Sequence, residues 1–218
     1  MLIEALVSRL TQGLANGSTL AARLTPGLGS LAVAQVEGEK DEASRAGIRF
    51  HLAGAPTGIA PVQALPTTAA QWILYNPANS KIVVFIDEIG EWLVSGTAGA
   101  GGTVLGALVG STQLPTTRPN ALASGLVCAN ASPATGRVSR LLVASGVTLA
   151  ANPGWKPIAW MNPAGTVLGQ TQMVNDHIKG GICLAPDTGY ALAVISPTGT
   201  TPLFAPCGSY REYACDIE

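Results

Sequence analysis

The stretch Gln71 to Val94, QWILYNPANSKIVVFIDEIGEWLV, decides the fold of this chain. Residues 72–75 and 81–94 are rich in β-branched and aromatic residues, which favour extended strands. Between them, residues 76–80 read Asn-Pro-Ala-Asn-Ser, and these residue types form turns. The pattern predicts two strands joined as a hairpin.

Similar strand patterns continue on both sides, separated by turns rich in Pro and Gly. They are predicted at residues 31–36, 47–52, 104–109, 125–128, 138–148, 158–161, 166–173, 181–184, 190–195 and 210–215. The 218 residues include 26 Gly and 15 Pro, which interrupt the apolar runs too often for long helices. We therefore expect a mainly β protein, with a jelly-roll or β-sandwich domain over residues 69–218.

Residues 1–68 are expected to form a short helix, a strand and an extended arm. Apolar residues recur three and four positions apart over residues 1–14, which predicts an amphipathic helix. Such a short helix is marginal alone, so its apolar side chains are candidate assembly contacts. They are Ile3, Leu6, Val7, Leu10 and Leu14. The densely charged residues 37–45 predict a solvated loop or short helix, and residues 54–68 an extended connector.

Charged residues are scarce, at 11% of the chain against about 25% in an average protein. Only seven lie between Trp92 and Tyr210, namely Arg118, Arg137, Arg140, Lys156, Asp176, Lys179 and Asp187. Because a solvated surface normally carries charge, much of this half is expected to face another subunit or protein. The same scarcity leaves few groups for acid–base chemistry, so we expect no enzyme activity.

Nucleic acid and membrane partners are not expected. The formal net charge is −1 and no block of Lys or Arg could neutralise phosphates. Residues 92–117 are free of charge, but their six glycines and interleaved polar residues would make membrane insertion costly. We therefore expect a soluble protein.

Two pairs of ionisable residues could suggest catalysis or metal binding. Asp87 and Glu91 would share one face of a regular strand, but neither a third oxygen-rich loop nor a glycosidase context accompanies them, so a solvated strand face is expected. Asp176 and His177 lack the G-x-S-x-G motif of a hydrolase. No catalytic residue, cofactor or metal site is predicted, and a hydrolase is the weakest hypothesis.

The cysteines and the tryptophans each allow two structural interpretations. Cys128, Cys183, Cys207 and Cys215 lack the paired spacing of zinc ligands, so they are expected to be isolated small apolar residues in strands. If any two form a disulfide, Cys207 and Cys215 are the first candidates, joined by a turn. Trp155 and Trp160, flanked by prolines, could anchor loops in the core or form a platform for a sugar.

Three stretches resemble a known family. Residues 72–80, WILYNPANS, with the strand to Val94 and the following Ser-Gly-Thr, resemble the opening hairpin of small jelly-roll proteins on tailed-phage virions. Residues 182–194, ICLAPDTGYALAV, are similar to their penultimate hairpin, and TGTTP at 198–202 and SYREY at 209–213 fit their last strand. The resemblance covers about residues 70–218 and rests on patterns rather than a fingerprint motif.

This resemblance implies a head decoration or cement protein. Such a protein is commonly a homotrimer that binds the major capsid protein on the virion surface, after assembly in the host cytoplasm, and braces the head against the pressure of its DNA. It would need no cofactor. The alternative is a glycan- or receptor-binding module of a phage tail spike or fibre, with Trp155 and Trp160 as its platform.

Overall fold

The structure is a computed structural model that describes residues 21–24, 31–34, 39–54, 56–97, 101–161, 172–175, 178, 180–195 and 200–215. Strands dominate, as the sequence predicts. The elements in chain order are β1 (Ala21–Leu24), β2 (Leu31–Ala34), α2 (Glu39–Arg45), β3 (Arg49–Gly54), β4 (Ala69–Asn76), β5 (Ile82–Thr97), β6 (Gly102–Val109), β7 (Leu126–Asn130), the 3-10 helix η1 (Pro133–Thr135), β8 (Leu142–Thr148), β9 (Lys156–Met161), β10 (Gln172–Asn175), β11 (Ile182–Leu184), β12 (Thr188–Ile195) and β13 (Thr200–Ala214).

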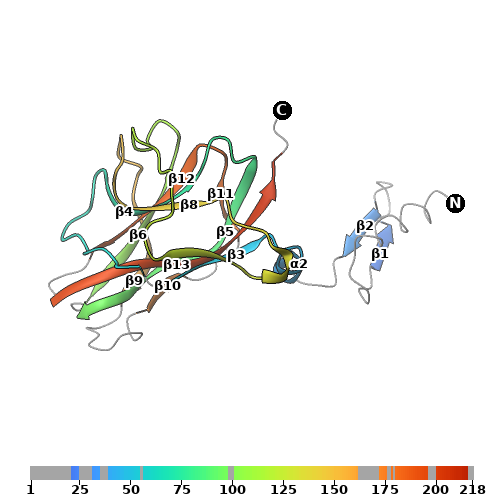
Figure 1. The fold of residues 1–218 in the computed structure, drawn as a ribbon, viewed down its shortest axis with the longest axis horizontal. Helices are drawn as coiled ribbons and strands as arrows, with labels where there is room; N and C mark the ends of the chain where they lie inside the picture. The colour runs from blue at the N-terminus through green and yellow to red at the C-terminus, as the bar shows by residue number, and fades with distance from the viewer. Residues whose placement is uncertain are drawn as a thin grey trace.

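Two antiparallel sheets pack face to face and form a β-sandwich (Figure 1). One has the strand order β10-β5-β13-β3-β7, with β11 also paired to β5, and the other has the order β8-β4-β12-β6-β9. Strands β1 and β2 form a separate antiparallel pair. The predicted fold class is confirmed.

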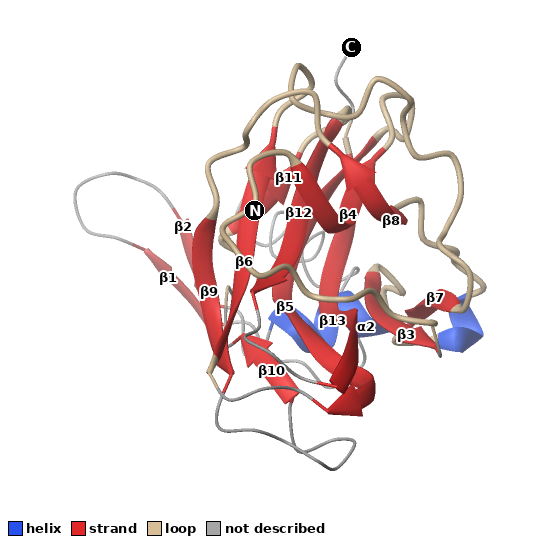
Figure 2. Ribbon diagram, turned by 90° about the vertical axis from the view of Figure 1, so that its left-hand side faces the viewer, coloured by secondary structure: helices blue, strands red, loops and turns tan. Residues whose placement is uncertain are grey.

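Eight of the strands have jelly-roll order. Along the chain they are β3, β4, β5, β6, β9, β10, β12 and β13. The first, eighth, third and sixth are neighbours in one sheet, and the second, seventh, fourth and fifth in the other, which is the double Greek-key arrangement. β7 and β8 are inserted between the fourth and fifth strands and extend the two sheets at one side. Figure 2 shows them opposite β9 and β10, which close the other side.

The hairpin expected over residues 72–94 is not formed. β4 pairs with β8 and β12, whereas β5 pairs with β10, β11 and β13, so the turn at 76–80 carries the chain from one sheet to the other. The buried Asn76 amide holds this corner, because it donates to the carbonyl oxygens of Ile82 at 2.8 Å and Leu184 at 3.0 Å. A turn that crosses between sheets and a hairpin turn have the same local sequence pattern. They differ only in which strands pair on either side of the turn. β11 and β12 likewise lie in different sheets.

The sandwich begins before residue 69. β3 pairs with β13 and with β7, so it is an integral strand rather than part of an arm. The connector that follows β3 joins the two sheets. Ile59 exchanges backbone hydrogen bonds of 2.8 and 2.9 Å with Phe204 on β13, and the Val62 N–H donates to the Val194 carbonyl on β12 at 2.9 Å.

The core lies between the sheets and is filled by large apolar side chains. Its fully buried members include Phe50, Leu74, Val84, Ile86, Ile89, Val143, Leu184, Tyr190, Leu192 and Tyr210. The phenol of Tyr190 reaches so close to β6 that a Cβ on Gly106 would lie 2.1 Å from its oxygen. Glycine is therefore required at this position of the strand.

Candidate functional site

The predicted site residues fall into three groups. The candidate assembly contacts Ile3, Leu6, Val7, Leu10 and Leu14 lie outside the described residues, as do Asp176 and His177. The tryptophans and the acids of β5 are described, and the structure changes the interpretation of both.

Trp155 and Trp160 have different environments. The Trp155 indole donates to the Thr67 carbonyl at 3.1 Å and packs on the apolar cluster that covers the outer face of the β4–β12–β6 region. Trp160 lies on the edge strand β9 and is 75% exposed. Among the described aromatic contacts these two rings do not meet. Trp155 therefore anchors a loop, and only Trp160 presents a free aromatic surface.

Asp87 and Glu91 do not form a solvated strand face, and that expectation is wrong. Both are fully buried. Tyr210 is opposite Ile86 and the next residue back along β13 is opposite Glu88, so Asp87 is the extra residue of a β-bulge. The bulge breaks the alternation that would have placed the two carboxylates on one face.

Asp87 is bound by the guanidinium of Arg211 on β13. The Arg211 Nε lies 3.1 and 3.0 Å from the two carboxylate oxygens, and Nη2 lies 2.9 Å from Oδ1. Both side chains are almost inaccessible to water, at 5% and 0% exposure. Arg211 also lies over the ring of Tyr213, 5.9 Å from its centre. The pair is fully engaged and locks β5 to β13.

Glu91 is a buried carboxyl group, and none of the residues that the structure describes forms a hydrogen bond with it. It alternates with Ile89 and Leu93, both core residues, so it faces the space between the sheets. Burial raises the pKa of Glu91 from 4.5 to about 8, because the charged form cannot be solvated there. The neutral acid is therefore the form that the fold accommodates at neutral pH.

The face of the sheet under α2 carries a smaller polar network. Lys40 of α2 donates to Glu88 Oε1 at 3.1 Å, and this bond lowers the pKa of Glu88. Arg49 lies 4.0 Å from the same oxygen and its Nη2 donates to Ser209 at 3.4 Å. His51 is half-buried beside them, and burial together with Arg49 lowers the pKa of its imidazole. The network attaches α2 to the sheet, so the charged segment forms the short helix rather than a loop.

A second network holds the loop between β7 and β8. Ser139 Oγ donates to Glu212 Oε1 at 2.5 Å and lies 2.7 Å from the Tyr210 hydroxyl. Glu212 also accepts the backbone N–H groups of Arg140 and Leu141 at 3.0 and 3.2 Å. Burial raises the pKa of Glu212, opposed by these hydrogen bonds. The carboxylate is thus occupied in shaping the loop.

The cysteines are free thiols. Cys207 lies within β13 and Cys215 directly follows it, with no turn between them. Eight residues of extended strand span about 26 Å, which rules out a bond between these two sulfurs. Burial raises the pKa of Cys207 to about 12, so its thiol is not a nucleophile at neutral pH.

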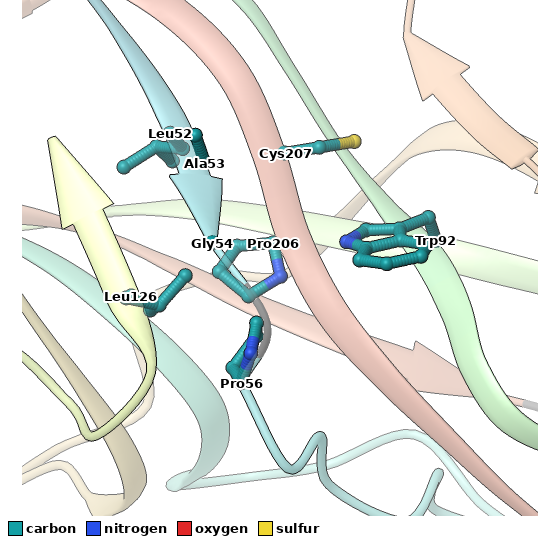
Figure 3. Close-up of a pocket in the computed structure, with 8 residues that line it drawn as sticks. All are labelled: Leu52, Ala53, Gly54, Pro56, Trp92, Leu126, Pro206 and Cys207. Carbon is teal, nitrogen blue, oxygen red and sulfur yellow. The ribbon is translucent and has the colours of Figure 1, made fainter. Parts of the chain in front are cut away.

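An apolar hollow of about 300 Å³ lies where β3 ends (Figure 3). Figure 3 shows Trp92 of β5 beside Pro206 and Cys207 of β13, with Leu126 of β7 on the other side. None of the described side chains that line it is charged. It could take an apolar side chain, but it offers no acid, base or nucleophile for chemistry.

Several groups were not found from the sequence. Arg211 and Glu212 act through partners 124 and 71 residues away in the chain, and no local pattern signals such pairs. In the part of the chain that the structure describes, no cluster of three His, Cys, Asp or Glu side chains could hold a metal ion. No helix among the same residues is long and apolar enough to cross a membrane.

Comparison with known proteins identifies no relative: no family model, no curated protein and no solved structure matches this chain.

Proposed function

We propose that this chain is a non-enzymatic structural protein of a phage particle, a decoration or cement protein on the outside of the head. In this proposal it forms a homotrimer on the major capsid protein and stabilises the shell, after assembly in the host cytoplasm. The jelly-roll order supports the proposal, because this architecture is common in viral capsid and lectin domains. Because one fold serves many functions, the fold alone does not identify the function, and the composition of the surface is the stronger evidence.

The observation that carries it is the lack of charge on the two strands, β7 and β8, that end the sheets at one side of the sandwich. Edge strands of solitary proteins are usually protected by Lys, Pro or covering loops, because their free N–H and C=O groups pair readily with other strands. β7 reads LVCAN and β8 reads LVASGVT, with neither charge nor proline. Val127 on β7 is 54% exposed. Uncharged edges of this kind suit burial against another subunit.

The remaining surface of this half supports the same proposal. Arg118 is paired with Asp187 at 3.2 Å, which leaves Arg137, Arg140 and Lys156 as the exposed charged residues among those described between Trp92 and Tyr210. The other exposed positions there are mainly Gly, Ser, Thr, Asn, Ala and Pro. Depletion of charge is the compositional mark of protein interfaces.

Light scattering on the purified full chain, with co-sedimentation on undecorated capsids, tests the proposal. We expect a trimer that pellets with the capsids. Val127→Lys places a charge on the edge of β7 and should weaken assembly or capsid binding. Leu65→Lys, at a site 65% exposed in the connector, is the matched control and should leave both unchanged. A monomer that does not pellet would overturn the proposal.

The alternative is a glycan- or receptor-binding module of a tail spike or fibre, and the observation in its favour is the exposure of Trp160. A free indole face on a rigid strand can stack on a sugar ring. Glycan-array binding that is lost on Trp160→Ala and retained in Trp160→Phe would favour this alternative. Trp155 would contribute only by holding its loop, so Trp155→Ala should lower stability as well as binding.

A further inference from the structure

A hollow of about 320 Å³ lies beside the loop between β7 and β8, away from the apolar hollow of Figure 3. The ends of β3, β5 and β13 form its other walls. Three cationic side chains line it, Lys81, Arg137 and Arg140, and all three residues are exposed. Two of them are among the few charges of the charge-poor half. These cations therefore lie together although charged residues are scarce over most of this segment.

Among the described residues that line this hollow, cations outnumber acids by three to one. Lys40, Arg49, Arg118 and Arg211 each face a carboxylate. Within the described ranges, the three cations of the hollow form no ion pair, and Arg140 instead donates to the carbonyl oxygen of Ser80. The acid among the described lining residues is Glu212, which interacts electrostatically with Arg140 and whose oxygens accept hydrogen bonds from the neighbouring loop.

The hollow also has apolar walls. Phe50 and Ile82 belong to the core and reach its lining. Val138 stands at its rim and is 82% exposed, the most exposed of the large apolar side chains described. Three cations around an apolar surface match a ligand that combines negative charge with an apolar group. The volume suits two or three amino-acid side chains.

We propose that this hollow binds an acidic peptide segment of a partner protein, in which an apolar side chain is flanked by carboxylates. The apolar residue would contact Val138 and the walls, and the carboxylates would pair with Arg137 and Lys81. Arginine forks bind carboxylates with two parallel hydrogen bonds, which gives such a site its geometry. This inference goes beyond the proposed function and does not depend on it.

The loop chemistry favours a peptide over a compact phosphate. Phosphate sites generally use converging backbone N–H groups. Here the N–H groups of Arg140 and Leu141 are already taken by Glu212. Only long side chains on the rim remain, and these can reach carboxylates that are spaced along a peptide. A nucleic acid would need more cations than the three present.

An NMR titration of the full chain tests the proposal, with an end-blocked Gly-Ser peptide carrying Glu-Leu-Glu at its centre as the probe. We expect amide shifts at Gly47, Lys81 and Val138, which weaken as salt is raised. The peptide with Gln-Leu-Gln should cause none. Absence of shifts at up to about 5 mM probe, the weak end of specific recognition, would overturn the proposal. Inorganic phosphate that shifts the same amides as strongly as the peptide would overturn the peptide assignment.

Charge variants distinguish binding in this hollow from non-specific electrostatic attraction of the peptide. Arg137→Gln and Lys81→Asn should each weaken binding of the Glu-Leu-Glu peptide about three- to tenfold. Asn is chosen for Lys81 because this residue has φ +55°, which Asn tolerates. Lys156→Gln, an exposed cation of β9, is the control and should not change binding. Equal affinity in all variants would contradict the site, whereas binding of a Lys-Leu-Lys peptide by Arg137→Glu would support it strongly.

Discussion

Glu91 makes the stability of this protein depend on pH in an unusual direction. Its pKa is about 8 in the fold and 4.5 in an exposed carboxyl group. Because the folded value is the higher one, the folded state holds the proton more tightly between these pH values. Glu91 therefore favours folding below about pH 4.5, and this contribution is lost as the pH rises toward 8. Most paired carboxylates have the opposite effect.

The substitution Glu91→Gln isolates this effect, since Gln has the same shape and does not ionise. The gap of about 3.5 between the two pKa values corresponds to about 5 kcal/mol, as an upper limit. At pH 5 the variant and the natural protein should have similar free energies of unfolding. At pH 9 the variant should be more stable, by up to that amount. Urea unfolding followed by tryptophan fluorescence at pH 5, 7 and 9 measures the difference.

The matched control is Glu88→Gln on the same strand. Glu88 faces Lys40 on the other side of the sheet, and its pKa is lowered by their hydrogen bond. A carboxylate whose pKa is lowered in the fold stabilises the folded state at pH values above its ordinary pKa. This stabilisation is lost on acidification. Glu88→Gln should therefore reduce stability at neutral pH and bring no gain at pH 9. Parallel pH profiles for Glu91→Gln and the natural protein would falsify the assignment of Glu91 as a buried, unpaired acid.

Three further predictions concern the fold. Asp87→Asn removes the buried carboxylate that binds Arg211 and should lower the free energy of unfolding by about 3–5 kcal/mol in urea denaturation; a loss under about 1 kcal/mol would contradict the buried pair. Gly106→Ala places a methyl group against the Tyr190 hydroxyl and should cost about 1–3 kcal/mol, and an unchanged thermal midpoint would argue against that contact. In a thiol-reagent assay Cys183 should react first in the native protein and four thiols after unfolding, while fewer than four would indicate a disulfide.

Strand positions could be predicted well where the pattern is local. β4, β5, β6 and β12 contain uninterrupted apolar and β-branched runs, and all four lie where the sequence places them. The first part of β13 was missed because Pro202, Pro206 and Gly208 resemble turn signals. In the structure, register shifts occur on either side of this segment, and such irregular pairing tolerates residues that a regular ladder excludes.

Partners and faces could not be predicted. Nothing near Asn76 in sequence says whether the chain folds back on its own sheet or crosses to the other, because that depends on Leu184, 108 residues later. The bulge at Asp87 is equally invisible, since its extra residue appears only when β5 is aligned with β13. The bulge turns Glu91 toward the core, whereas Asp87 is buried by its contact with Arg211. The cationic hollow likewise joins Lys81 to a loop more than fifty residues away.

By itself the sequence determined the amount of strand, the turn positions and the scarcity of charge, because each of these follows from the properties of neighbouring residues. The tertiary structure decided which strands are neighbours, which carboxyl groups are buried and where the remaining cations converge. These depend on contacts between residues far apart in the chain, whose free energies are gained only when the two sheets close on a common core. The segment between Trp92 and Tyr210 shows this contrast. Its scarcity of charge is a property of the sequence, whereas the fold decides which of its residues lie in the core, on sheet edges or around the cationic hollow.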